Sequence, residues 1–205
     1  MIRFQNFKKQ YGEFTALDIP AFEMDAGIYW LKGINGSGKS TLLKSLGGII
    51  PFNGNLFVEG LDVLKQKRTH RKIVNYAEAE PVFPEFLTAI DLIDFFISTK
   101  GGSKGKCLQQ LEILNMTPAL NKKTGTYSSG MLKKLSLALA FTGTPKWILL
   151  DEPLITLDIE AIEHISCWIE EHVTNGVSFI LTSHQSIPFQ KTLPQTLSIE
   201  NRTII

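Results

Sequence analysis

Residues 33–40 read Gly-Ile-Asn-Gly-Ser-Gly-Lys-Ser, and this octapeptide constrains the fold more than any other part of the chain. It matches the pattern G-x-x-x-x-G-K-[ST] at every fixed position. A short apolar run at residues 28–31 precedes it, and residues 40–46 follow it with helical spacing. Because the pattern binds phosphate only between a strand and a helix, this setting favours a phosphate-binding loop over an ordinary glycine-rich turn.

Each position of the octapeptide has a chemical reason. The glycines permit turns that are closed to other residues and bring backbone N–H groups against phosphate oxygens. Lys39 supplies a positive charge for the outer phosphates, Ser40 offers a hydroxyl to Mg²⁺, and the following helix directs its partially positive N-terminus at the anion. The predicted ATP-binding residues here are Gly33, Asn35, Gly36, Ser37, Gly38, Lys39, Ser40 and Thr41.

A second feature is a pair of carboxylates at the end of an apolar run. Residues 147–150 read Trp-Ile-Leu-Leu, a buried strand by pattern, and Asp151 and Glu152 follow directly. At such a strand end Asp151 would hold Mg²⁺, usually through water, and Glu152 would orient or deprotonate an attacking water. The structural alternative is a pair that caps the turn before Pro153. Beside the phosphate loop, the catalytic interpretation is favoured.

The order of the elements predicts an α/β protein. Apolar runs at residues 28–31, 147–150 and 177–181 are typical of strands buried on both faces, and helical segments alternate with them, which favours a parallel sheet covered by helices. Residues 87–140 read as a helical insertion, and the N-terminal part reads as short strands and turns, including the hairpin-type dipeptide Asn53-Gly54. One helix should bury a face made of Ile159, Ile162, Ile165, Ile169 and Val173.

Composition excludes several other classes. The 205 residues are 43% hydrophobic, enough for one core, so we expect a single domain over residues 1–205. A formal net charge of +1 gives no field for nucleic acid. Cys107 and Cys167 form no C-x-x-C pair, which argues against a zinc site or a disulfide framework and for a reducing cytosol. The best apolar stretch, residues 89–98, is broken by Asp91 and Asp94, so no membrane crossing is expected.

Taken in chain order, these segments resemble the ATPases of the ABC family, from about residue 2 to residue 184. The family signature L-S-G-G-Q corresponds to residues 127–131, Tyr-Ser-Ser-Gly-Met, in which Ser128 and Gly130 match. The resemblance implies that these two residues contact the γ-phosphate of ATP across a dimer interface. Ser128 as an ordinary helix N-cap is the alternative. The Tyr-Ser and Gly-Met variant is similar to the branch that pairs with export-type permeases.

Three further residues match positions of that family. Asp158 corresponds to the family's Asp loop, which links the two sites of a dimer, and N-capping of the next helix is an equally good interpretation. His184 follows an apolar strand and corresponds to the switch histidine that senses the γ-phosphate. Tyr11 corresponds to the aromatic residue that stacks on adenine, and Phe14 lies close to it in the sequence.

One family position is altered. Alignment of residues 76–88 with the family places Ala79 where a glutamine is expected, with Glu78 and Glu80 on either side. Either carboxylate would offer an oxygen to the Mg²⁺ ion or to water. How the cation is sensed in this chain is therefore left open by the sequence.

The resemblance implies a P-loop NTPase core of RecA-like type, with an N-terminal antiparallel β region and a helical subdomain. It implies a Mg-dependent ATPase that powers transport through a separate membrane permease, as a head-to-tail homodimer or paired with a related ATPase. The chain would then lie at the cytoplasmic face of the membrane. The alternatives are a soluble ABC ATPase of repair or translation, a weakly active regulatory subunit and a small-molecule kinase, which would leave the signature and His184 unexplained.

Overall fold

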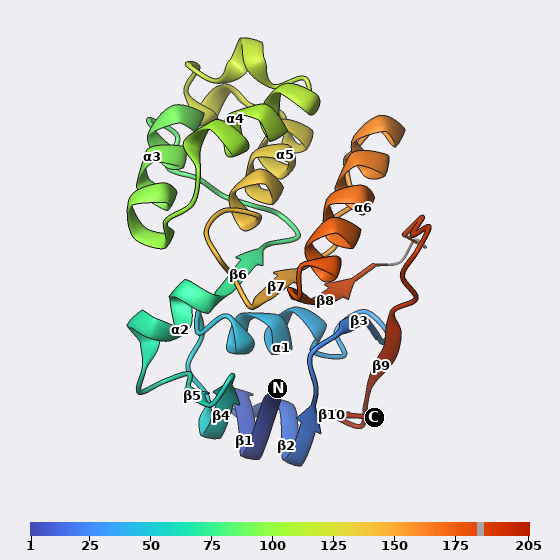
Figure 1. Cartoon of the computed structure of the whole chain (residues 1–205). Coiled ribbons are helices and arrows are strands. Elements are labelled where there is room, and N and C mark those ends of the chain that lie inside the picture. Colours follow the sequence, from blue (N-terminus) through green and yellow to red (C-terminus); the bar gives the residue numbers. More distant parts are fainter. Residues whose placement is uncertain (184–186) are drawn as a thin grey trace.

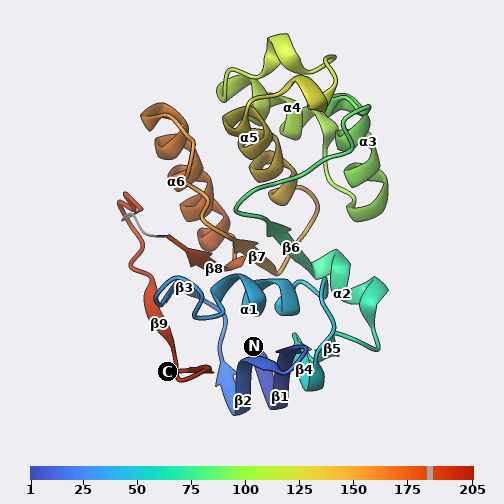
Figure 2. The ribbon, with the colours of Figure 1, turned by 180° about the vertical axis from the view of Figure 1, so that it is seen from behind.

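A computed structural model describes residues 1–183 and 187–205. The chain forms layers around a central six-stranded sheet (Figure 1). On one side of that sheet lie α5 (Ser129–Ala140), α6 (Ile159–Thr174) and the rest of the helical region. On the other side α1 (Lys39–Leu46) lies between the sheet and a second, antiparallel sheet. The view from behind shows the same order of layers (Figure 2).

The central sheet has the order β10-β9-β3-β8-β7-β6. All of its pairings are parallel except that of β9 with β10, so the predicted parallel sheet is confirmed. The strands are β3 (Ile28–Lys32), β6 (Val74–Ala77), β7 (Trp147–Leu150), β8 (Ser178–Thr182), β9 (Gln195–Glu200) and β10 (Thr203–Ile204). The carboxyl ends of β3, β7 and β8 meet at one edge, where a ligand binds in sheets of this kind.

The position of β7 between two cores explains why its sequence is apolar throughout. Trp147 and Leu149 face the core shared with α1 and the antiparallel sheet, whereas Ile148 and Leu150 face the core beneath the helical region. All four side chains are buried. Side chains alternate between the two faces of a strand, so in a strand covered on both sides every polar side chain would be buried at a cost in free energy.

The antiparallel sheet has the order β2-β1-β4-β5 and confirms the expected N-terminal β region. Its strands are β1 (Ile2–Tyr11), β2 (Phe14–Met24), β4 (Asn53–Val58) and β5 (Leu61–Asp62). The hairpin expected at Asn53-Gly54 is wrong, because both residues begin β4. Gly54 has a φ of 84° and lies at the irregularity in the β1–β4 register, where a Cβ would overlap the Asn6 carbonyl oxygen.

The helical region expected near residues 87–140 contains α3 (Ala89–Lys100), α4 (Lys104–Ile113) and α5 (Ser129–Ala140). Thr88 begins α3 with a capping box, in which its hydroxyl accepts from the Asp91 backbone N–H and the Asp91 carboxylate accepts from the Thr88 backbone. Asp91, one of the two acidic residues that interrupt the apolar stretch, therefore belongs to the capping box. The helices are α1 (Lys39–Leu46), α2 (Lys67–Ile73), α3 (Ala89–Lys100), α4 (Lys104–Ile113), α5 (Ser129–Ala140) and α6 (Ile159–Thr174), with the 3₁₀ turns η1 (Thr117–Ala119) and η2 (Thr124–Thr126).

The buried face of α6 differs in part from the predicted one. Ile165 and Ile169 are fully buried, but Ile159, in the first turn, is 78% exposed. Trp168 is buried on this face, which the isoleucine spacing did not predict. None of the helices formed by the described residues has the length and apolar character that a membrane span requires.

Candidate active site

The phosphate-loop segment and the carboxylate pair meet in one cleft of about 360 Å³. The loop joins β3 to α1, and the carboxylates follow β7, two strands away across the sheet. The topology therefore brings together side chains that are more than a hundred positions apart in the sequence. The cleft is lined by Tyr11, Phe14, Ala16, Asn35, Gly36, Gly38, Lys39, Ser40, Thr41, Asp151 and Glu152.

At two positions of the loop a glycine is needed for two reasons: the backbone has a positive φ, and neighbouring atoms leave no room for a Cβ. Gly33 has a φ of 150°, and a Cβ there would come within 2.5 Å of Ser37 Oγ. Gly38 has a φ of 109°, and a Cβ there would lie 2.9 Å from a methyl carbon of Leu17. A side chain at Gly33 would collide with the loop itself and one at Gly38 with β2, so the glycines fix where the N–H groups of the loop point.

Lys39 opens α1 and lies at the mouth of the loop. Its Nζ donates to the carbonyl oxygen of Gly33 at 2.7 Å and to that of Ile34 at 3.2 Å. These contacts hold the ammonium over the loop, beside the N-terminus of the helix. Positive charge and free helix N–H groups at one point form a site suited to phosphate.

Asp151 is buried and held by two hydroxyl groups. Thr182 at the end of β8 donates to Oδ1 at 2.7 Å, and Tyr76 from β6 donates to Oδ2 at 3.3 Å. The same carboxylate raises the pKa of Tyr76, after the larger effect of burial, so the phenol stays protonated and keeps donating. The orientation of Asp151 thus depends on strands on both sides of β7.

Glu152 has a φ of 45°, in the left-handed region that residues other than glycine rarely adopt. Its backbone N–H donates to Thr182 Oγ1 at 2.8 Å, and buried Pro153 follows it. One hydroxyl therefore holds both carboxylate residues. Backbone strain kept in place by such contacts is concentrated at functional sites.

The residues present suit a magnesium ion. Ser40 and Asp151 both line the cleft and offer a hydroxyl and a carboxylate oxygen, the hard donors that Mg²⁺ prefers. Groups of three or more His, Cys, Asp or Glu side chains that could hold a metal do not occur in the described ranges. Mg²⁺ characteristically takes only one or two protein carboxylates and completes its shell with phosphate and water, so this donor set fits.

Tyr11 and Phe14 lie at the β1–β2 turn, on the rim of the same cleft. Tyr11 is 50% exposed, and Lys9 Nζ lies 4.4 Å from the centre of its ring. Phe14 is 60% exposed, and the Arg202 guanidinium lies 5.9 Å from its ring. Two open aromatic rings beside a phosphate-type loop offer surfaces on which a base could stack.

The signature segment, residues 127–131, begins α5 and does not line this cleft. Ser128 is the N-cap of α5 and accepts from the Met131 backbone N–H at 3.2 Å, so the capping contact exists. Gly130 lies so near the loop after β7 that a Cβ would come within 2.8 Å of the Thr156 carbonyl oxygen. Tyr127 is buried and donates its hydroxyl to the Ala119 carbonyl at 2.7 Å.

Asp158 caps one helix and binds a lysine of another. Its Oδ1 accepts from the Ala161 backbone N–H at 2.8 Å and thereby caps α6. Its Oδ2 accepts from Lys134 Nζ on α5 at 2.7 Å, and this bond contributes most to lowering the pKa of Asp158. The carboxylate therefore joins the start of α6 to the signature helix within one chain.

Three residues at the site belong to none of the motifs recognised in the sequence. Thr182 and Tyr76 hold Asp151, and Lys133 binds the Asp151 carbonyl from α5. A hydroxyl at the end of an apolar strand and a lysine within an apolar helix are the signals that could have drawn attention to them. His184 lies outside the described residues.

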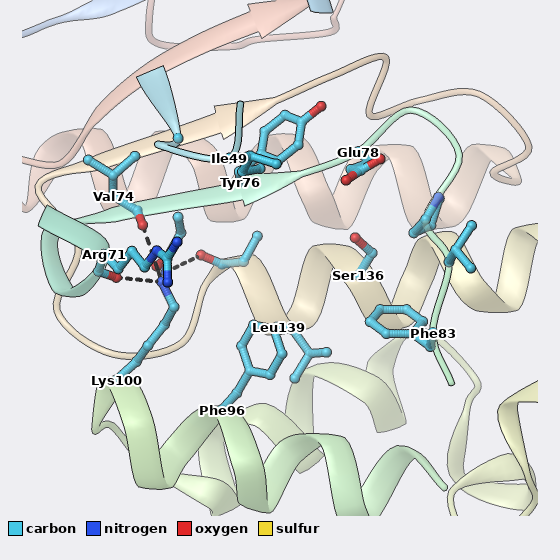
Figure 3. Close-up of a pocket in the computed structure, with 15 residues that line it drawn as sticks. Ile49, Arg71, Val74, Tyr76, Glu78, Phe83, Phe96, Lys100, Ser136 and Leu139 are labelled. Carbon is cyan, nitrogen blue, oxygen red and sulfur yellow. Dashed lines mark hydrogen bonds between the residues drawn. The ribbon is translucent and has the colours of Figure 1, made fainter. Parts of the chain in front are cut away.

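The segment that replaces the glutamine loop does not line the cleft. Glu78 pairs with Lys44 of α1 at 3.3 Å, and Ala79 follows it without a side chain that could reach the cleft lining. Glu78 instead lines a second cleft, of about 300 Å³, between α1, β6 and the helical region (Figure 3). Within that cleft Lys100 donates to the carbonyls of Arg71 and Val74 and to the Asn75 side chain, at 2.8, 3.2 and 2.5 Å.

A phosphate-type loop between β3 and α1, with a carboxylate pair at the end of β7, defines a P-loop nucleotide-binding protein. The family model described as ABC transporter matches residues 19–155, about two thirds of the chain. The chain belongs to the ABC transporter family and carries its ATP-binding part.

The names of similar proteins are consistent with this family. The chain is 31% identical over 186 residues to the lantibiotic transport ATP-binding protein SrtF of Streptococcus pyogenes, which covers 90% of this chain and 80% of that protein. It is 28% identical over 190 residues to the linearmycin resistance ATP-binding protein LnrL of Bacillus subtilis, which covers 90% of this chain. The chain spans 61% of the length of that second relative.

Solved structures show the same fold. An ATP-binding subunit of an ABC transporter superposes with a TM-score of 0.87 at 22% identity, over the whole of this chain and 88% of the other. A dimeric ATP-binding cassette in a post-hydrolysis state, bound to ADP and Pi, gives 0.81 at 19% identity, over the whole of this chain and 96% of the other. The predicted P-loop core with an antiparallel β region and a helical region is thereby confirmed.

Proposed function

We propose that this chain is a Mg-dependent ATPase that hydrolyses ATP to ADP and phosphate and thereby powers transport through a separate membrane permease. The observation that carries the proposal is the cleft in which Lys39, Ser40, Asp151 and Glu152 meet. Phosphoryl transfer needs little covalent help, so positioned charges and a positioned water suffice for catalysis. The roles follow from where these four residues lie.

Lys39 and the N–H groups of the loop would bind the outer phosphates and stabilise the charge that develops on them. Ser40 and Asp151 would hold Mg²⁺, which neutralises phosphate charge when bound. Glu152 would accept a proton from the attacking water, with its backbone fixed by Thr182. His184 is proposed, on the family resemblance alone, to stabilise the γ-phosphate.

The second half of the site would come from another chain. Ser128 and Gly130 do not line the cleft that holds Lys39, so in this proposal they contact the nucleotide of a partner chain. We infer a head-to-tail dimer, of two copies or with a related ATPase, in which ATP bridges the loop of one subunit and the signature segment of the other. The dimeric form of a structural neighbour supports this arrangement.

The permease would rest on the second cleft, between the core and the helical region. Ile49 and Val82 line it and are 49% and 89% exposed, so they offer apolar surface that a bound segment would cover. A segment bound there would contact both lobes. The relatives named for lantibiotic transport and linearmycin resistance support an exporter, and the chain would act at the cytoplasmic face, where ATP is available.

The deciding experiment compares the wild-type chain with Glu152→Gln. Glutamine keeps the shape of the side chain but cannot accept a proton, so kcat should fall by about 10²–10⁴-fold. Asp151 and Lys39 are unchanged, so MgATP should still bind. ATP that is not hydrolysed should then hold two chains together.

Steady-state phosphate release measures the first effect, and size-exclusion chromatography with light scattering, with and without ATP, measures the second. A shift from monomer to dimer only with ATP is expected for Glu152→Gln. Wild-type hydrolysis by this variant would remove the catalytic role of Glu152. An inactive variant that stays monomeric at saturating ATP would contradict the dimer of identical chains.

A further inference from the structure

Lys133 is the most deeply buried cation in the described part of the chain that touches the active site. It lies one turn into α5, and only 1% of its surface is exposed. Its Nζ donates to the carbonyl oxygens of Glu78 at 2.8 Å, Ala79 at 3.0 Å and Asp151 at 3.0 Å. All three donors of the ammonium are thus used by backbone carbonyls.

These three acceptors belong to two segments that are not neighbours in the sequence. One is the loop after β6, and the other is the end of β7, where the proposed magnesium and water residues lie. Lys133 itself belongs to the helix that begins at the signature residue Ser128. A single side chain therefore joins three parts of the molecule whose relative positions determine the geometry of the site.

A role in packing alone does not explain a lysine here. Burial opposes a charge, and desolvation lowers the pKa of Lys133 to about 8, although the nearby carboxylates of Asp151, Glu152 and Glu80 act in the opposite direction. An apolar side chain would fill the same space without this cost. An apolar side chain could not donate hydrogen bonds to three carbonyl groups, so these bonds indicate a role beyond packing.

We infer that Lys133 is a positioning residue, which fixes the end of β7 and residues 78–80 relative to the signature helix α5. This inference rests on the proposed ATPase function. When α5 moves, the bond to the Asp151 carbonyl transmits the movement to the peptide that precedes Glu152. The proposed general base is then in place only when the helix that carries Ser128 is in place. Because its three donors all bind backbone carbonyls, Lys133 acts through the position of Glu152.

Lys133→Met tests the inference, because methionine has a similar length and no donor. We expect kcat to fall by about 10–100-fold, since misplacement of a catalytic group by about 1 Å costs on that order. The KM for ATP should change little, because Lys39 and the loop keep their own contacts. Lys133→Arg, which restores donors, should recover part of kcat, a recovery that a role in filling space would not produce.

Glu170→Met is the matched control. Glu170 is also a buried charged side chain with three backbone partners, but it accepts from the N–H groups of Gln190, Lys191 and Thr192 and joins α6 to the segment before β9. Its loss should lower the free energy of unfolding and leave kcat at the wild-type value. If both methionine variants lose kcat equally, general loosening explains the effect and the inference is overturned.

Hydrogen exchange gives a readout that does not depend on hydrolysis. The Asp151 N–H donates to the Ala77 carbonyl, and the Glu152 N–H donates to Thr182, so both amides are protected. In Lys133→Met these amides and those of residues 78–80 should exchange faster, while the amides within β8 keep their protection. Lys133→Gln, which retains a donor, replaces the methionine variant if that one does not fold.

Wild-type kcat in a folded Lys133→Met protein overturns the inference, and so does unchanged exchange at residues 78–80 and 151–152. If the wild-type chain itself hydrolyses no ATP, the proposed function fails instead. The exchange pattern alone then decides whether Lys133 fixes the two segments.

Discussion

Replacement of Tyr11 by alanine should weaken ATP binding by about 5- to 140-fold and leave kcat nearly unchanged. The range follows from base–aromatic stacking, worth about 1–3 kcal/mol per base, at about 1.4 kcal/mol for each factor of ten in Kd. Tyr11 suits this role because half of its surface is open at the rim of the cleft that contains Lys39. The Lys9 ammonium covers one face of the ring, which leaves the other face for adenine.

Isothermal titration of MgATP into the Glu152→Gln background measures the affinity without turnover. Tyr11→Phe keeps an aromatic face and should bind ATP nearly as well as Tyr11 does. GTP should lose affinity by a similar factor in Tyr11→Ala, because stacking tolerates any base. Equal ATP affinity in Tyr11→Ala would refute the assignment. If Phe14→Ala shows the loss instead, the base rests on the neighbouring ring beside Arg202.

Two further predictions concern the loop and the core. Lys39→Ala should abolish hydrolysis and strongly weaken MgATP binding, and unchanged phosphate release by the purified variant would argue against the loop as the phosphate site. His70 is fully buried, and burial lowers its pKa from 6.5 to about 4, so below pH 6.5 the unfolded chain takes up a proton that the folded chain does not. Stability should therefore fall by about 2 kcal/mol between pH 7.5 and 5, measured by urea unfolding, and His70→Gln should lack this part of the decrease.

The sequence predicted the elements that are specified locally. The loop at residues 33–40 was predictable because its glycines and its flanking strand and helix are contiguous, and β7 because a strand buried on both faces must be apolar throughout. Strands β6 and β9 were not predicted. Val74–Ala77 is only four residues long, and Gln195–Glu200 alternates polar and apolar residues at the side of the sheet, so neither has the strong apolar signal of a central strand.

The hairpin prediction at Asn53-Gly54 failed for a related reason. The dipeptide favours positive φ, and Gly54 does adopt it, but the conformation serves a strand irregularity opposite Asn6 and not a turn. A dipeptide preference specifies a backbone angle, whereas the partner strand decides what that angle is used for. The contacts of Lys133 could not be predicted for the same reason, because its acceptors belong to two segments that are distant in the sequence.

The altered signature can be understood from the contacts of its five positions. Ser128, which matches the family, caps α5, and Gly130, which also matches, has no room for a Cβ beside the Thr156 carbonyl. Tyr127 departs from the family leucine, but its ring is buried in the core of the helical region and its hydroxyl is bonded to Ala119. Ser129 is exposed. The departures thus fall where a side chain can change without moving the backbone, and the helix N-terminus that would face a second nucleotide keeps its geometry.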